Sequence, residues 1–178
     1  MSPIIIREYS PDWPSQYRRL QATLWPLVSD IALTMEHVGS TAVEGLAAKP
    51  IIDADIVIEG MADLDEVCRR LDAAGYDFLG DRGIEMRFAF RCREPAFAHH
   101  LYVCIDGCLA LRNHRLLRQH LRHHEEARLR YGELKRSLAR RHPDDIDAYL
   151  RGKTAFITDI LDDYGVGDEE LHLIEEQN

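Results

Sequence analysis

The segment Ile-Ile-Asp-Ala-Asp-Ile-Val-Ile at residues 51–58 constrains this chain more than any other part of its sequence. Its β-branched residues predict a strand. Side chains alternate across a strand, so Asp53 and Asp55 share one face while the apolar residues beside them take the other. Neighbouring carboxylates repel each other unless a cation lies between them or one is protonated. The pattern therefore predicts a sheet with one apolar and one acidic face, and the acidic face suits a metal ion.

A Gly-Ser pair precedes this strand. Residues 33–38 predict a short strand that runs directly into Gly39 and Ser40. Glycine lets the backbone approach an anion closely, and the N–H groups of such a turn can bind a phosphate. Taken alone, the pair favours a simple strand-to-helix turn in which Ser40 caps the next helix. Combined with the acidic strand, the pair indicates a phosphate site beside a metal site. Nucleotidyl transfer requires both sites.

Composition sets broader limits. The chain has 178 residues, enough for one domain with its own core. It has no apolar run long enough to span a bilayer and no signal-type start, so we expect a cytoplasmic protein without membrane contact. The net charge of −9 argues against a protein that coats nucleic acid. A small phosphorylated ligand is compatible with it, because a local basic cluster or a cation can reverse the sign inside a cleft.

Periodicity in the first half of the chain predicts helices and strands in mixed order. We expect an amphipathic helix over residues 13–28, capped by Asp12 and bent or broken near Pro26. Beyond the acidic strand, the expected elements are a helix over residues 62–74 and strands over residues 84–91 and 99–105.

The second half reads as helical. One long helix or two begin at residue 109, and Pro143 opens a final helix over residues 144–161. The acidic end, residues 167–178, is expected either to fray or to form a short helix. Strands first and helices after predict an α+β protein with a small mixed β-sheet, flanking helices and a C-terminal helical segment.

Together with its flanks, the acidic strand resembles the GrpB family (UPF0157-type), a bacterial branch of the nucleotidyltransferase superfamily of the DNA polymerase β type. The main match is EHVGSTAVEGLAAKPIID at residues 36–53. The other matching segments are YSPDWP (9–14), HHLYV (99–103), LRNH (111–114), YGELK (131–135) and YLRGKTAFI (149–157).

The resemblance covers residues 4–162 and implies a single nucleotidyltransferase-like domain. We expect this domain over residues 1–165, with a sheet core at about 30–107 and a helical part at about 109–163. An acidic C-terminal tail over residues 166–178 follows.

The resemblance also implies an activity. We expect a nucleotidyltransferase that needs Mg²⁺ or Mn²⁺ and moves a nucleotidyl group from a nucleoside triphosphate to a small molecule or a protein acceptor. In this reaction Asp53 and Asp55 bind the metal, and Gly39 and Ser40 hold phosphates. The short helical cap leaves little room for a long nucleic acid, and no oligomeric state is indicated.

Two alternatives use the same fold. The first is a catalytically inactive nucleotide- or metabolite-binding module. The second is a different group transfer in the same cleft, such as acyl-nucleotide or ligase-like chemistry.

The third carboxylate of the wider superfamily is missing from its expected place. Active members usually carry it on a later strand, where it binds metal or deprotonates the attacking hydroxyl. Here that strand begins with His99 and His100. Alternation places His100 and Tyr102 on one face and His99 on the other. We favour His100 as metal ligand or base, with Glu85 and Asp106 as the alternative acids; Tyr102 stands where many family members have a second histidine.

Positive side chains should hold the phosphates or an acidic second substrate. Lys49 directly precedes the acidic strand, and Arg87 lies on the neighbouring strand, where family members also carry arginine. Arg118 and Lys153 lie in family motifs and are the favoured pair. For each of these four residues the alternative is a solvated surface position.

The remaining histidines and cysteines carry no predicted role. His120 and His124 are one helical turn apart, but they lack an HExxH pattern and an evident third ligand, so a hydrated helix face is expected for them and for His114 and His123. The four cysteines form no CxxC pair, and we expect buried, reduced thiols.

Overall fold

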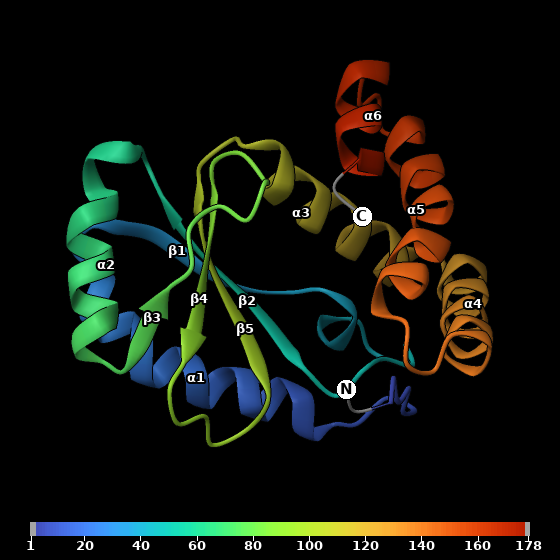
Figure 1. Ribbon diagram of the computed structural model, residues 1–178, viewed down its shortest axis with the longest axis horizontal. Coiled ribbons are helices and arrows are strands. Elements are labelled where there is room, and N and C mark those ends of the chain that lie inside the picture. Colours follow the sequence, from blue (N-terminus) through green and yellow to red (C-terminus); the bar gives the residue numbers. More distant parts are fainter. Residues whose placement is uncertain (1–2, 177–178) are drawn as a thin grey trace.

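The computed structural model describes residues 3–176 of the chain. Five strands and two helices occur in mixed order up to Ile105, and only helices follow (Figure 1). In order, the elements are α1 (Asp12–Val28), β1 (Ala32–Val38), β2 (Ile52–Ile58), α2 (Leu64–Ala73), β3 (Tyr76–Phe78), β4 (Arg87–Cys92), β5 (His99–Ile105), α3 (Leu109–His123), α4 (Glu125–Arg141), α5 (Ile146–Asp163) and α6 (Asp168–Glu176). Short 3₁₀ turns occur at η1 (Ser40–Ala42) and η2 (Met61–Asp63). The expected α+β class with a mixed sheet is confirmed.

The strands form one sheet in the order β1-β2-β5-β4-β3. β2 and β5 are parallel, and the other neighbours are antiparallel. The register places Asp53 opposite His100 and Asp55 opposite Tyr102 on the adjacent central strands. The predicted acidic strand is therefore an interior strand of the sheet, with β1 on one side and β5 on the other.

The two faces of the sheet have different coverings. α1 and α2 cover the apolar face (Figure 1), and together they bury the alternate β2 side chains that the sequence assigns to a core. The central buried residues of this core are Leu20, Leu24, Val28, Ile52, Ala54, Ile56, Ile58, Val67 and Leu71. On the acidic face, α3 packs over one end of the sheet through Leu111, against Val57 and Cys104. Other side chains of the acidic face, such as Asp53 and His100, line a cavity.

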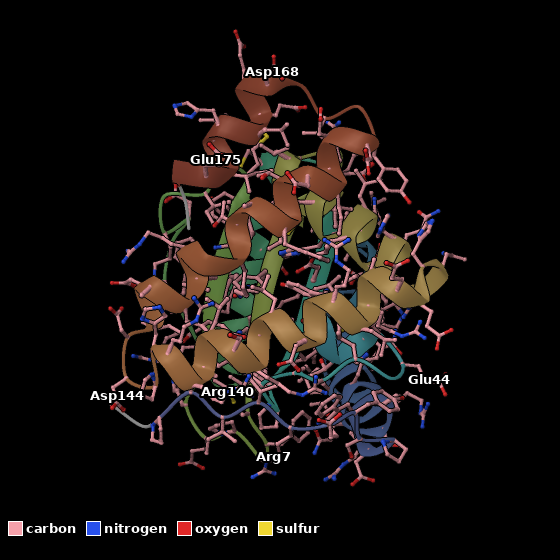
Figure 2. The ribbon with its side chains drawn as sticks, turned by 90° about the vertical axis from the view of Figure 1, so that its right-hand side faces the viewer. Arg7, Glu44, Arg140, Asp144, Asp168 and Glu175 are labelled. Carbon is pink, nitrogen blue, oxygen red and sulfur yellow. The ribbon has the colours of Figure 1, made fainter. Side chains whose placement is uncertain are left out.

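The helical part closes this cavity. Leu121 of α3, Tyr131 of α4 and Ile160 of α5 pack together around Val43 and Leu46, which follow η1. Figure 2 shows α4 and α5 crossing in front of the sheet, with the strands behind them. The helical part is thus packed onto the Gly-Ser turn rather than onto the sheet alone.

Several predicted helix boundaries are wrong. Pro11, not Asp12, is the N-cap of α1, and no side chain caps that end. Pro26 does not break the helix, which continues to Val28; its ring removes a single N–H donor from the last turn. The last long helix begins at Ile146 rather than at residue 144, because Asp145 caps it by accepting the N–H of Ala148 at 2.9 Å.

Other local predictions differ from the structure in the same way. The strand expected from residue 84 begins at Arg87, because Arg82 and Met86 have positive φ angles that do not fit a strand. The three-residue strand β3 is too short to give a periodic signal and was not predicted. The helical stretch from residue 109 is two helices, which separate at His124.

The acidic end of the chain forms α6, which packs on α5 through Val166, Ile174 and Leu161. All four cysteines are free; Cys104 and Cys108 are buried, and the other two are half-buried. Among residues 3–176, no helix combines the length and the apolar character that a bilayer crossing would need.

Candidate active site

The Gly-Ser turn lies directly against the acidic strand. β1 ends at Val38, and Gly39 then adopts a φ of 68°, a left-handed value that favours glycine. A Cβ added at Gly39 would collide with the Asp53 carboxylate. Glycine is therefore required at this position both by its backbone angle and by the close approach of Asp53.

The two aspartates lie side by side but in different surroundings. The Asp53 side chain is 28% exposed and accepts a hydrogen bond from His100 Nδ1 at 2.8 Å. The Asp55 side chain is fully buried and accepts one from His114 Nδ1 at 2.7 Å. Burial opposes protonation of His114, but the adjacent Asp55 charge and hydrogen bond outweigh it, so the pKa of His114 is raised. Each carboxylate thus has a histidine partner from a different element.

The acid pair fits a divalent cation. Asp53 faces the cavity, and Asp55 Oδ1 is buried with no hydrogen-bond partner among the described residues. Carboxylate oxygens are the ligands that Mg²⁺ and Mn²⁺ prefer. Within residues 3–176, however, no three histidine, cysteine, aspartate or glutamate side chains converge to form a cluster that could hold a metal. Asp53 and Asp55 are the side chains that would hold the ion.

The histidine pair of β5 separates as alternation predicts. His100 lies on the acidic face beside Asp53, whereas His99 lies within hydrogen-bond distance (2.8 Å) of the Tyr76 hydroxyl. The alternative acids lie elsewhere. Glu85 is exposed in the loop before β4, and Asp106 lies 3.6 Å from Arg115. Neither acid lines the cavity at Asp53.

The cavity on the acidic face has a volume of about 490 Å³ and collects all the lysines of the chain. Lys49 comes from the loop before β2, Lys135 from α4 and Lys153 from α5. The Lys135 Nζ donates to Ser40 Oγ at 2.8 Å, and the Lys153 ammonium lies 4.7 Å from the centre of the Tyr149 ring. No described carboxylate forms a salt bridge with any of them.

Burial has consequences for these lysines. It lowers the pKa of Lys153 to about 8, and it lowers the pKa of Lys135 well below its ordinary value, with the Lys153 charge acting in the same direction. Burial also lowers the pKa of Lys49, which the Asp53 charge partly opposes. Clustered, partly desolvated lysines that form no salt bridge with a carboxylate make a site that gains strongly from a polyanion.

The two predicted arginines differ in their availability. Arg87 lines the cavity with its guanidinium 4.4 Å from the centre of the Tyr102 ring, and its Nε is buried without a hydrogen-bond partner in the described part of the chain. The Arg118 Nη atoms instead donate to Glu36 Oε2 at 2.7 Å and to the His37 carbonyl at 2.6 Å. Arg118 therefore fixes α3 to β1.

The sequence prediction missed two residues of the site. A hydrated helix face was wrong for His114, which binds Asp55. Lys135 was not among the four positive side chains assigned to the phosphates, although it is buried at the Gly-Ser turn. Both lie in segments that match the family motifs, LRNH and YGELK, and this was the signal available.

A family model and known relatives match most of the chain. The protein-family model described as "GrpB protein" matches residues 3–163. The chain belongs to the GrpB family. This GrpB chain is 31% identical over 149 residues to UPF0157 protein YqkA of Bacillus subtilis, a match that covers 84% of this chain and 43% of that protein. It therefore spans less than half the length of that relative.

Solved structures show the same fold. The conserved protein GrpB from Enterococcus faecalis superimposes with a TM-score of 0.79 at 32% identity, covering 97% of this chain and 98% of that one. The Cid1 poly(U) polymerase bound to Mg 3'-dATP superimposes with a TM-score of 0.57 at 16% identity, covering 84% and 50%. At that identity the likeness concerns the fold alone, and it places this GrpB chain among nucleotidyltransferase-like folds.

Proposed function

We propose that this protein is a divalent-cation-dependent nucleotidyltransferase that transfers a nucleotidyl group from a nucleoside triphosphate to a small molecule or a protein acceptor. One observation carries the proposal: all three lysines of the chain line the cavity that also contains Gly39, Ser40 and Asp53. A substrate that fits these lysines needs several negative charges close together. It must also place one of its phosphorus atoms beside the pair of aspartates. A nucleoside triphosphate meets both requirements.

The chain's own residues have separable roles in this proposal. Lys49, Lys135 and Lys153 bind the β- and γ-phosphates and stabilise the negative charge that grows on pyrophosphate as it leaves. Gly39 lets the Asp53 carboxylate lie directly against the turn, and the Ser40 hydroxyl, held by Lys135, orients the phosphates. Lys135 is buried and Lys49 and Lys153 are half-buried, and this partial exclusion of water strengthens each charge interaction.

The acid pair places the cation. A divalent ion held by Asp53 and Asp55 would supply positive charge at the reacting phosphate. His100 and His114 each donate to one of these carboxylates, so they fix the orientation of the carboxylates in the site. His100, half-exposed at the edge of the cavity, is the residue that we assign to positioning the attacking hydroxyl.

The test is direct. Purified protein is incubated with Mg²⁺ or Mn²⁺, labelled nucleoside triphosphates and a metabolite extract, and release of pyrophosphate and formation of a labelled adduct are measured. We expect Asp53→Asn to abolish both signals, whereas Asp65→Asn, an exposed acid of α2, keeps them at the wild-type level. Both variants should melt within a few degrees of the wild type. Equal activity in Asp53→Asn and the control would contradict the proposal.

A second candidate function has its own support. Both carboxylates already accept a histidine hydrogen bond, and no third acid joins them among residues 3–176. This arrangement favours a nucleotide- or metabolite-binding module without turnover. Nucleotide binding to the wild type without any pyrophosphate release, in the presence of either metal, would identify this module.

A further inference from the structure

A second, smaller cavity of about 220 Å³ opens from the reaction site on the side that neither Lys49 nor Lys135 lines. The end that it shares with the lysine cavity is lined by Gly39, Ser40, Asp53, Ile84, Arg87, His114 and Lys153. The two cavities follow one another along α5. Tyr149 lines the lysine cavity, Lys153 lines both cavities, and Ile157, one turn further on, lines the smaller one. The reacting phosphate at Asp53 would therefore lie between two compartments of different chemistry.

The smaller compartment is apolar beyond this shared end. Its far walls come from α3, α5 and α6, through the side chains of Leu109, Leu117, Leu121, Ile157 and Ile174. The cations Arg87, His114 and Lys153 all belong to the shared end. Beyond it the charged side chain of the lining is Arg118, which is bound to Glu36 and to a carbonyl. The far part of the compartment therefore offers no unpaired charge to a second phosphate.

One polar atom interrupts the apolar walls. Asn113 Oδ1 is buried and has no hydrogen-bond partner among the described residues. Asn113 and Leu117 are one turn apart on α3, and both line the compartment. An unsatisfied buried amide is costly in the empty protein and is satisfied by a ligand that presents a complementary polar edge.

We propose that this compartment binds the nucleobase of the substrate, with Asn113 recognising the polar edge of the base. The proposal rests on the proposed function, since it extends the same substrate from its phosphates to its base. A cavity of ~150 Å³ in an unrelated protein accommodates benzene, so 220 Å³ has room for a flat heterocycle. A nucleobase is uncharged and largely apolar on its faces, and it carries hydrogen-bonding groups only at its edge, as this compartment requires.

The test separates the base from the phosphates. Affinities of inorganic tripolyphosphate and of the four nucleoside triphosphates for the full chain are measured by calorimetry with Mg²⁺. We expect at least one nucleoside triphosphate to bind more than tenfold tighter than tripolyphosphate. Asn113→Leu, which keeps the volume and removes the amide, should weaken that nucleotide about tenfold and leave tripolyphosphate unchanged.

A second variant fills the space. Leu117→Trp should remove the advantage of the nucleotide over tripolyphosphate, whereas Gln119→Trp, an exposed position on the same helix, should keep it. Unchanged tripolyphosphate affinity shows in each variant that the fold and the lysine cavity are intact.

The failures are distinguishable. If tripolyphosphate binds but no nucleotide binds better, or if Asn113→Leu and Leu117→Trp leave the nucleotide affinity unaltered, the base site is wrong and the phosphate site stands. If neither tripolyphosphate nor any nucleotide binds to the wild type, the proposed function and this inference are both overturned.

Discussion

At the scale of single residues, arginine and lysine have different roles in this chain. The salt bridges of the described structure use arginine or histidine; Arg70, Arg118 and Arg136, for example, each bind carboxylates through their guanidinium groups. A guanidinium is always charged and forms fixed, planar contacts. A lysine is a mobile point charge whose pKa responds to burial, which suits a ligand that comes and goes. The restriction of lysine to one cavity follows this difference.

The pKa of Lys153 gives a prediction of stability against pH. Its value of about 8 in the folded chain lies below the ordinary value of 10.5. Below pH 8 the amine is charged in both states, and folding carries the full cost of desolvating it. Between pH 8 and 10.5 the unfolded chain binds more protons than the folded one, so stability rises with pH.

Replacement of Lys153 by methionine should remove this cost. We expect Lys153→Met to raise the free energy of unfolding by about 1–3 kcal/mol at pH 7, and this gain should shrink as the pH approaches 10.5. Urea denaturation at several pH values measures the difference from the wild type, with Arg151→Met as an exposed control on α5. A gain that is the same at every pH would show that Lys153 is not desolvated.

The residues that the sequence predicted and those that it missed differ in how they reach the site. Asp53, Asp55 and His100 were placed correctly because strand alternation is local and has a period of two. Lys135 and His114 reach the site across 95 and 59 residues of chain, to Ser40 and Asp55 respectively. No local pattern fixes such a contact, because it depends on how the helices pack onto the Gly-Ser turn.

At the scale of elements, the spacing of α4 and α5 determines the lysine cavity, because Lys135 and Lys153 come from these two helices. The helices lie beside each other over the sheet (Figure 2). Gly152 of α5 faces Leu138 of α4, and a Cβ at position 152 would collide with the leucine side chain. The glycine therefore permits the close approach that brings the two lysines to one cavity.

A methyl group at this contact should separate the helices. At an uncrowded helix position, Gly→Ala raises the free energy of unfolding by about 1 kcal/mol. Overpacking at this contact costs about 1–3 kcal/mol. Gly152→Ala should therefore lower the free energy of unfolding or leave it unchanged. Tripolyphosphate should bind more weakly to this variant, because Lys153 adjoins the added methyl group. Urea denaturation and calorimetry measure the two effects.

The matched control is a double-mutant cycle with Leu138→Ala, which removes the side chain that the new methyl group meets. If the collision is real, Gly152→Ala should cost less in the Leu138→Ala background than in the wild type. Additive effects would place the glycine in open space and would detach it from the cavity.

At the scale of the whole molecule, the lysine cavity joins two parts of the chain that have separate cores. The sheet and its two helices bury one core, and α3, α4 and α5 bury another against the residues after η1. Lys49 belongs to the first part, whereas Lys135 and Lys153 belong to the second (Figure 1). A polyanion bound to all three would link the parts and relieve the repulsion between the lysines.

Binding of a polyanion should therefore stabilise the whole fold. A ligand present at 100 times its Kd adds about 2.7 kcal/mol, which for a chain of this size corresponds to a rise in Tm of about 5–10 °C. We expect inorganic tripolyphosphate to give this shift at pH 7 and a smaller one at pH 10, where Lys153 loses its proton. Lys135→Gln should lose most of the shift, because it removes the cation held at the Ser40 hydroxyl. Sodium chloride at equal ionic strength is the control for general screening of the chain's net negative charge. If sodium chloride raises the Tm as much as tripolyphosphate does, the three lysines do not act as one site.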